Sequence, residues 1–492
     1  MRRVESLALL LLVVAGALLR ALPITTWPLE LDETLTLRHA RVDPGLFLTW
    51  DHHAHHAPLA YALVRGAMVL FGTEAEWALR LPSTIAGVLC IPAAFLLGRL
   101  AHGAWAAMLL AALVAFDPTL VHQAVHARMY ALLALEFFVV LILLLASMRG
   151  RGNRKWLWLG LGLSLAAAAW THALGLVLWL GVLAPVGLRF HDRSVRTGAA
   201  IAFGVALVTS GIGLFPKWQA AGQSIRFRSS IIAGPADQIA ITLRRIGDVY
   251  PIEWVGPLLV ILGLGGLLLL RRRSTPAATA LLVIAIASVS YGLLAARLRP
   301  FGLDRYLLLF RLAIHVGLAV AVIELRPRAI RSIGIISILL LALGLSVAAY
   351  PTRLPPDHAV GAVVRALRRH HFVPGQVVAY EPGNLYFLGE YYGLPTTFEV
   401  GPRAAAVPDG YEYPLTWVVF GHGDALHTHV PGIREELSPH VHVVAWKLAQ
   451  FYGVPYDEKM VEKRLLSDGT LAIGMSRGRT HVLTLDQALR SQ

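Results

Sequence analysis

Two adjacent carboxylates, Asp32 and Glu33, follow the first apolar segment of the chain by about ten residues. Later in the same polar stretch, Asp51 begins a histidine-rich run that includes His55 and His56. Acids and imidazoles beside a hydrocarbon segment suit proton transfer or cation binding at a membrane surface. Alternatively, the two acids only favour a helix N-terminus, where negative charge is stabilising. The pattern by itself leaves both interpretations open.

The composition is that of a membrane protein. Of the 492 residues, 56% are hydrophobic and the mean hydropathy is +0.61. Only 15% are charged, against about 25% in a typical soluble protein. The chain is therefore predicted to cross a membrane several times.

The formal net charge of +14 does not indicate nucleic-acid binding. The basic residues form short clusters between apolar runs, at 149–155, 271–273 and 326–331, which is typical of cytoplasmic loops in membrane proteins. The single cysteine, Cys90, excludes both an intramolecular disulfide framework and a cysteine-based zinc site. We therefore expect the bilayer, and no nucleic acid, as a partner.

Eleven apolar segments are predicted to span the membrane. The first follows Arg2-Arg3 without a visible cleavage site, so we interpret it as a span with a cytoplasmic amino terminus. Even-numbered spans then end beside the arginine clusters, as the positive-inside rule requires. The predicted spans are 4–22, 78–98, 104–123, 128–148, 156–172, 174–190, 198–215, 254–270, 277–296, 306–323 and 333–350.

The predicted membrane domain covers residues 1–350, and its first outer loop covers 23–77. Within that loop, residues 58–71 are too short to cross the bilayer and carry Arg65, so an interfacial amphipathic helix is expected.

The remaining residues, 351–492, are predicted to form a small α/β domain outside the membrane. Short buried strands are expected at 376–380, 416–420 and 440–446, with helical patterns near 384–392 and 432–437. The region has no glycine-rich phosphate loop, so we assign it no nucleotide.

Further polar residues gather at the predicted outer ends of the spans. They can line one cavity, because spans converge in a bundle. Carboxylates for proton abstraction beside arginines for an anion suit a lipid-phosphate substrate. These residues are Asp117, His126, Arg128, Tyr130, His172, Arg305 and Tyr306, beside the acids Asp32, Glu33 and Asp51 of the first outer loop.

The sequence resembles the GT-C membrane glycosyltransferases of family 39, which include protein mannosyltransferases and aminoarabinose transferases. The run between residues 56 and 132 carries the most specific part of the resemblance, close to "LFG…ALRLPS" and "QEARMYAL". The matching segments are Asp32-Glu33, His56 to Tyr61, Leu70-Phe71-Gly72, Ala78 to Ser83, Ala127 to Leu132, Thr171-His172 and Arg305-Tyr306-Leu307.

Two departures from the family pattern concern histidines. The usual His-Pro-Pro is His56-Ala57-Pro58 here, and the usual Gln-Glu before Ala-Arg is Val125-His126. An imidazole therefore replaces a carboxylate that helps to place the substrate. Members of the family differ in metal use, so the resemblance leaves a divalent metal undecided.

The resemblance implies an inverting transferase that moves a sugar from a polyprenyl-phosphate donor to an acceptor on the outer face of the membrane. It implies Asp32 as the base, with Glu33 assisting. Donor phosphate would be held by Arg128, Arg305, Tyr130 and Tyr306, and a substrate or metal site would comprise Asp51, His55, His56, His126 and His172.

Two other functions remain open. Glu136, Arg311 and His315 lie inside predicted spans, and the cost of polar groups in lipid predicts that they face the bundle and pair there. A transporter or lipid flippase suits eleven spans with Glu136 and Arg311 inside them, but the sequence has no inverted repeat. A non-catalytic scaffold of an envelope complex would not need the acid pair. The sugar, the lipid carrier and the acceptor, whether protein, lipid or glycan, are not specified by the sequence.

Overall fold

The computed structural model divides into two compact units, residues 1–24 with 40–352 and residues 25–39 with 353–492. The residues it describes are 3–27, 29–42, 58–149, 155–228, 246, 255–298, 304–349, 377–380, 391, 416–420, 462–465 and 471–475.

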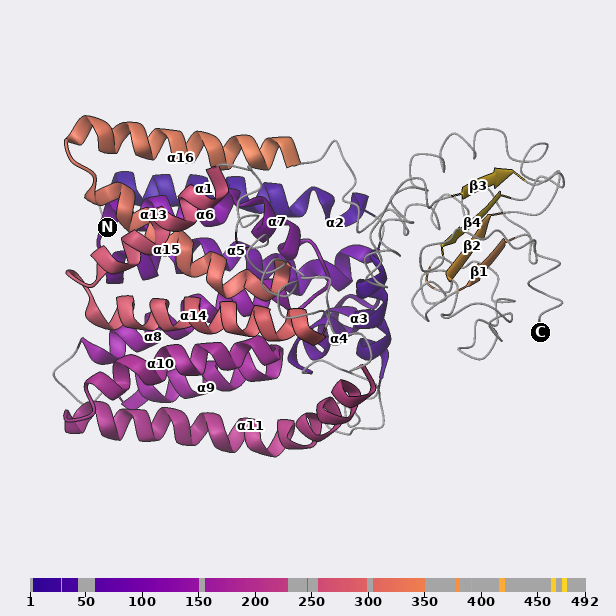
Figure 1. Ribbon diagram of the computed structural model, residues 1–492, viewed down its shortest axis with the longest axis horizontal. Coiled ribbons are helices and arrows are strands. Elements are labelled where there is room, and N and C mark those ends of the chain that lie inside the picture. The colour runs from indigo at the N-terminus through magenta and orange to yellow at the C-terminus, as the bar shows by residue number, and fades with distance from the viewer. Residues whose placement is uncertain are drawn as a thin grey trace. The chain divides into compact units, whose positions relative to one another are not determined.

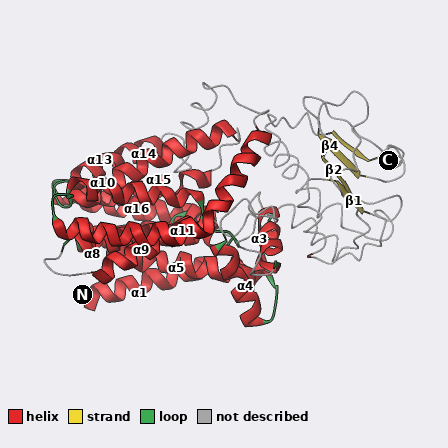
Figure 2. Cartoon of the chain, turned by 90° about the horizontal axis from the view of Figure 1, so that it is seen from below, coloured by secondary structure: helices red, strands yellow, loops and turns green. Residues whose placement is uncertain are grey.

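Long helices that lie side by side form the first unit (Figures 1 and 2). They are α1 (Arg3–Ala21), α4 (Leu59–Phe71), α5 (Glu76–Ala101), α6 (Ala104–Phe116), α7 (Pro118–Ala124), α8 (Tyr130–Met148), α9 (Lys155–Thr171), α10 (Leu176–Leu188), α11 (Arg193–Arg228), α13 (Val255–Leu270), α14 (Thr275–Leu298), α15 (Leu308–Glu324) and α16 (Arg328–Ala349). Two 3₁₀ turns, η2 (Ala173–Gly175) and η3 (Asp304–Leu307), precede α10 and α15.

Every predicted span coincides with a helix, except 104–123, which coincides with α6 and α7 together. By length and composition, six helices among the described residues can cross a membrane, or seven if a bent pair counts as one span. The chain is therefore a multi-pass helical membrane protein, while the count of eleven spans stays a prediction. The expected short helix at 58–71 is confirmed as α4.

The third predicted span is not continuous. Helix α6 ends before Asp117, and α7 leaves it at an angle of 59°. The cause is local, because Pro118 has no N–H to donate and forces Asp117 into an extended conformation. The carboxylate of Asp117 then accepts a hydrogen bond of 2.8 Å from the backbone N–H of Leu120 and caps α7.

The predicted division of 156–190 into two segments is confirmed at the level of helices, whereas their crossing of the membrane stays a prediction. Helix α9 ends at Thr171, and His172 has an extended backbone with φ −162° and ψ 151°. The turn η2 follows at once and leads into α10.

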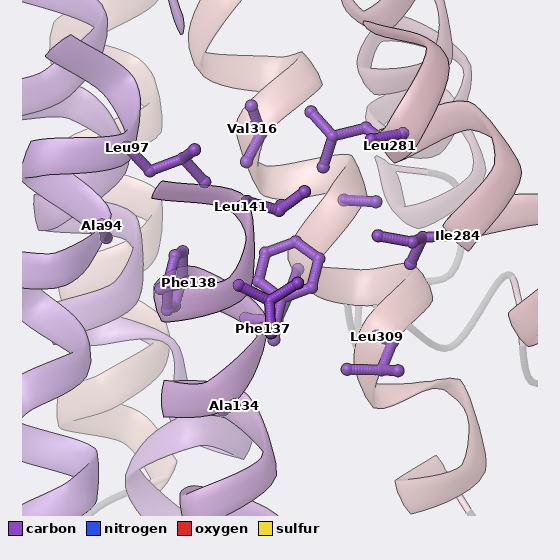
Figure 3. Close-up of a cluster of buried hydrophobic side chains, with 14 of the residues drawn as sticks. Ala94, Leu97, Ala134, Phe137, Phe138, Leu141, Leu281, Ile284, Leu309 and Val316 are labelled. Atoms are coloured by element: carbon purple, nitrogen blue, oxygen red, sulfur yellow. The ribbon is translucent and has the colours of Figure 1, made fainter. Parts of the chain in front are cut away.

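Helix α8 carries the centre of the apolar core. Phe137 and Phe138 are fully buried and meet edge to face, with ring centroids 5.2 Å apart. Side chains of α5, α14 and α15 surround them, including Leu97, Leu281 and Val316 (Figure 3).

Helices α13 and α15 approach each other closely through glycines. A Cβ atom built on Gly266 would collide with the carbonyl of Gly317, and one built on Gly317 would collide with the carbonyl of Gly263. Membrane helices often associate through such small residues, because these let the backbones come within van der Waals contact.

Arginines at the predicted cytoplasmic ends of the helices satisfy carbonyl groups of neighbouring helices. Arg149 donates to the carbonyl of Leu100, and Arg189 donates to that of Met148 at 3.2 Å. Since the last carbonyls of a helix have no partner within it, these contacts tie helix ends together.

The second unit contains α3 (Leu31–Arg41) up to residue 39 and one antiparallel sheet. The strands are β1 (Val377–Tyr380), β2 (Thr416–Phe420), β3 (Glu462–Leu465) and β4 (Leu471–Met475), in the order β1-β2-β4-β3. The pairings include Val377 with Phe420, Thr416 with Met475 and Glu462 with Gly474.

Two of the predicted strands, near 376–380 and at 416–420, are confirmed as β1 and β2. The predicted strand at 440–446 and the helix near 432–437 lie outside the described residues, as does the helix near 384–392 except for Tyr391, which is helical. Strands β3 and β4 were not predicted from the sequence. Their signal is Asp468-Gly469, a dipeptide favoured in hairpin turns, which lies between them.

Candidate functional site

A buried turn between α7 and α8 presents Arg128, whose side chain and backbone are only 5% exposed. Helix α5 holds this turn in place. The Ser83 hydroxyl donates to the Arg128 carbonyl at 2.8 Å, and the Thr84 hydroxyl donates to the Ala124 carbonyl at 2.9 Å. Two segments that carry the family resemblance, 78–83 and 127–132, therefore contact each other directly.

Tyr130 joins three separate parts of the chain at one place. It begins α8 and is 1% exposed. Its ring centroid lies 5.6 Å from that of His172, in the turn before η2. The guanidinium carbon of Arg305, in η3, lies 5.6 Å from the same ring. An arginine above an aromatic ring is attracted to its negative face, which favours this position for Arg305.

Arg128 precedes Tyr130 by two residues in the same buried turn, and the Tyr130 ring contacts both Arg305 and His172. Together with Tyr130 these residues form the four-residue cluster, as we call it below. It contains two permanent positive charges, a phenol and an imidazole. Such a set can bind an anion, because guanidinium groups match the geometry of phosphate oxygens.

Contacts on both sides fix His172 in this cluster. Its own Nδ1 accepts a hydrogen bond of 2.9 Å from the backbone N–H of Leu174. The hydroxyl of the preceding residue, Thr171, donates to Oε1 of Glu136 at 2.6 Å. Glu136 was expected to pair inside the bundle, but no sequence pattern indicated that its partner is a threonine at the end of α9.

The other predicted residues of this face have different neighbours. The Tyr306 ring packs against Tyr291 of α14, with centroids 6.0 Å apart. The His126 ring lies 4.1 Å from that of His122, at the end of α7.

The acid pair lies in the first turn of α3, within the second unit. Oε2 of Glu33 accepts a hydrogen bond of 2.8 Å from the backbone N–H of Glu30, which is one half of a capping box. Glu33 therefore stabilises the N-terminus of α3, which is the alternative role that the sequence allowed for the acid pair. Asp32 is half-buried, and its backbone carbonyl accepts from the Thr36 hydroxyl at 3.4 Å.

A buried ion pair lies at the break between α6 and α7. Nη1 of Arg311 donates to both carboxylate oxygens of Asp117, and Nε2 of His315 lies 3.0 Å from the same group. The sequence grouped Asp117 with the polar residues of the outer face. The structure instead makes it the partner of Arg311 and His315, which were expected to pair somewhere inside the bundle.

Arg20, at the end of α1, is fully buried. Its role in joining α1 to α6 was not predicted from the sequence. It donates to the carbonyls of Gly16, Ala115 and Val114 at 2.9 to 3.0 Å. These contacts satisfy the last carbonyls of α6 where the chain breaks. The arginine at the end of an apolar segment was the available signal.

The histidine-rich run and its acid, with Asp51, His55 and His56, lie outside the described residues. Among the described residues, no group of three or more His, Cys, Asp and Glu side chains is placed to hold a metal ion. The metal site suggested for this run is therefore untested.

The chain is similar to known glycosyltransferases. Residues 55–212 match a family model described as dolichyl-phosphate-mannose-protein mannosyltransferase. No curated protein sequence matches the chain.

Two solved structures share the fold along nearly its whole length. One is ArnT from Cupriavidus metallidurans bound to undecaprenyl phosphate, with a TM-score of 0.58 and 14% identity, covering 94% of this chain and 97% of that chain. The other is the apo state of the same protein, with a TM-score of 0.56 and 15% identity, covering 96% and 99%.

Proposed function

Because the chain has the fold of the GT-C membrane glycosyltransferases, we propose that it is an inverting glycosyltransferase. It would move a pentose or hexose from a polyprenyl-phosphate donor to an acceptor on the outer face of the membrane. The observation that carries this proposal is the four-residue cluster, in which Arg305 and His172 meet the ring of Tyr130, two residues after Arg128, although they come from distant parts of the sequence.

The cluster would bind the phosphate of the donor. Attack at the anomeric carbon breaks the bond to the phosphate oxygen, so negative charge grows on that oxygen in the transition state. Fixed positive charges beside it stabilise this charge without reorganisation. The bound undecaprenyl phosphate in ArnT supports a lipid phosphate as the class of ligand. In this chain, Arg128 and Arg305 would supply the charge, and Tyr130 and Tyr306 would border the site.

The acceptor hydroxyl needs a base, whereas the leaving phosphate is stable as an anion and needs no acid. This differs from glycoside hydrolysis, which uses two carboxyl groups. By the family resemblance we assign the base to Asp32. Glu33 would orient this segment, which agrees with its hydrogen bond to the backbone of Glu30.

The histidine-rich run admits two roles. With Asp51, the side chains of His55 and His56 would either hold a divalent cation or contact the substrate directly, and His126 belongs to the same proposal. If a metal is needed, excess chelator should abolish sugar transfer, and zinc or manganese should restore it. Full activity in chelator, with no metal in the purified protein, would remove the metal.

The proposed topology places the amino terminus in the cytoplasm. Eleven spans within residues 1–350 would then leave residues 351–492 outside, as a small α/β domain. The acceptor would be a protein, a lipid or a glycan on that side.

The decisive experiment gives the purified full-length protein a panel of polyprenyl-phosphate sugars together with membrane extract as the acceptor source. Consumption of one donor with formation of a covalent sugar product is the expected result. Absence of any product across the panel, from protein that remains folded, would contradict the proposal.

The bent pair of α6 and α7 favours a second candidate, a transporter or lipid flippase, because transport sites often use interrupted helices. Reconstituted vesicles separate the two functions. A transporter moves the lipid-linked substrate across the bilayer without a covalent product, whereas a transferase forms the product.

A further inference from the structure

The hydrogen bonding of His172 determines which of its ring nitrogens carries the proton. Nδ1 lies 2.9 Å from the backbone nitrogen of Leu174, whose N–H can only donate. Nδ1 must therefore accept, and an accepting ring nitrogen carries no proton. In the neutral imidazole the proton is then on Nε2, at the other side of the ring, which becomes a hydrogen-bond donor.

The surroundings of His172 suit a neutral donor. The residue is 3% exposed and its ring packs beside that of Tyr130, which the guanidinium of Arg305 also approaches and which Arg128 precedes by two residues. A neutral imidazole adds no like charge to this pair of cations, and its N–H extends the same set of donors. Every polar hydrogen of the two guanidinium groups is also a donor. All three side chains therefore favour an anionic oxygen as their hydrogen-bond acceptor.

We propose that His172 donates its Nε2–H to a phosphate oxygen of the lipid-linked donor and is neither a metal ligand nor a base. This inference rests on the proposed function and specifies the chemistry of the same site. A metal or a proton would need a lone pair on Nε2. That lone pair exists only in the tautomer with a proton on Nδ1, which would point that proton at the N–H of Leu174.

The neighbouring contacts make His172 a rigid donor. Thr171 is tied to Glu136, and the Tyr130 ring packs beside the imidazole. Because the turn is fixed before ligand binds, little conformational freedom is lost when the N–H meets the phosphate.

The substitution His172→Asn separates the two hydrogen bonds of this side chain. Asparagine is a good cap, so its oxygen can still accept from the N–H of Leu174. Its side chain is too short to place a donor where Nε2 stands. His172→Ala removes both contacts and serves as the matched control for the capping role.

The test measures binding of undecaprenyl phosphate to the purified full-length protein, together with thermal stability in the same detergent. We expect His172→Asn to keep the wild-type unfolding midpoint and to bind about ten- to a hundredfold more weakly, since a hydrogen bond to a charged group is lost. Neutral undecaprenol should bind wild type and variant equally. A parallel titration with inorganic phosphate distinguishes a lipid headgroup from a free anion as the ligand. If the site takes a free anion, His172→Asn should weaken binding of inorganic phosphate as much as binding of undecaprenyl phosphate.

Wild-type affinity of His172→Asn for undecaprenyl phosphate would overturn the inference and leave His172 as a cap. A zinc affinity that falls in His172→Asn relative to wild type would overturn it in favour of a metal ligand. These outcomes concern binding alone, so they are distinct from a failure of the proposed function, which is the absence of sugar transfer by the wild-type protein.

Discussion

The carboxylate of Asp117 and the guanidinium of Arg311, 194 residues apart in the sequence, form a buried ion pair in which Nη1 lies 3.0 and 2.8 Å from the two oxygens. The pair joins the break between α6 and α7 to the first turn of α15. Helix α15 follows η3, which carries Arg305 of the four-residue cluster. The ion pair thus anchors the helix that begins directly after the proposed phosphate contact.

Removing one member of this pair should strongly destabilise the protein. Arg311→Met leaves the charge of Asp117 buried without its guanidinium, and breaking a buried pair typically costs about 3–5 kcal/mol. Asp117→Asn keeps the cap of α7 but leaves the arginine charge. The double variant should recover part of the loss, because no uncompensated charge remains. Thermal unfolding of the three variants in detergent checks this, and strictly additive losses would contradict a coupled pair.

Asp32→Asn should reduce turnover by at least about a hundredfold, the lower end of what a general base contributes. Donor affinity should change little, because the proposed phosphate contacts belong to other residues. The matched control is Glu33→Gln, whose amide oxygen can still accept from the N–H of Glu30. Normal turnover of Asp32→Asn would defeat the assignment of the base and leave the acid pair as a helix cap.

Arg128→Ala and Arg305→Ala should each weaken use of the donor about ten- to a hundredfold, because each removes a charge-assisted contact with phosphate. Kinetics with varied donor concentration measure this. Arg189→Ala is the control, since that arginine also lies at a helix end but donates to the Met148 carbonyl. Donor kinetics unchanged in both test variants would assign these arginines to the membrane headgroups instead.

Gly266→Ala should destabilise the bundle by about 1–3 kcal/mol, the usual cost of overpacking, because its methyl group would meet the Gly317 carbonyl. Gly265→Ala is the matched control on the same helix, where a Cβ meets nothing within 4 Å. That control should be neutral or slightly stabilising, since alanine favours a helix over glycine. Unfolding midpoints of the two variants that do not differ would refute the close contact of α13 and α15.

The topology is tested by labelling single cysteines in intact cells, in a background where Cys90 is replaced by serine. A membrane-impermeant reagent should label Gly410→Cys directly and should label Gly152→Cys only after lysis. The reverse pattern would invert the topology that the arginine clusters predict.

The sequence by itself determined the helical membrane class and the positions of the helices. Both follow from local properties, since long apolar runs and the arginine clusters between them depend on no distant contact. Motif segments such as 78–83 and 127–132 also identified the family resemblance before any geometry was known. The division of 156–190 was predictable from the same arginine clusters, because their placement on one side of the membrane requires two segments there.

The partners of the polar residues were decided only by the tertiary structure. The sequence required Glu136 and Arg311 to be paired, because a lone polar group in lipid is costly. It could not say that the partners are Thr171 and Asp117, since these choices depend on which helices pack together. The tautomer of His172 was equally out of reach, because it is set by the direction of one backbone N–H. Periodicity and composition record which residues are buried, whereas the hydrogen bonds that assign each buried group its role arise from packing between distant segments.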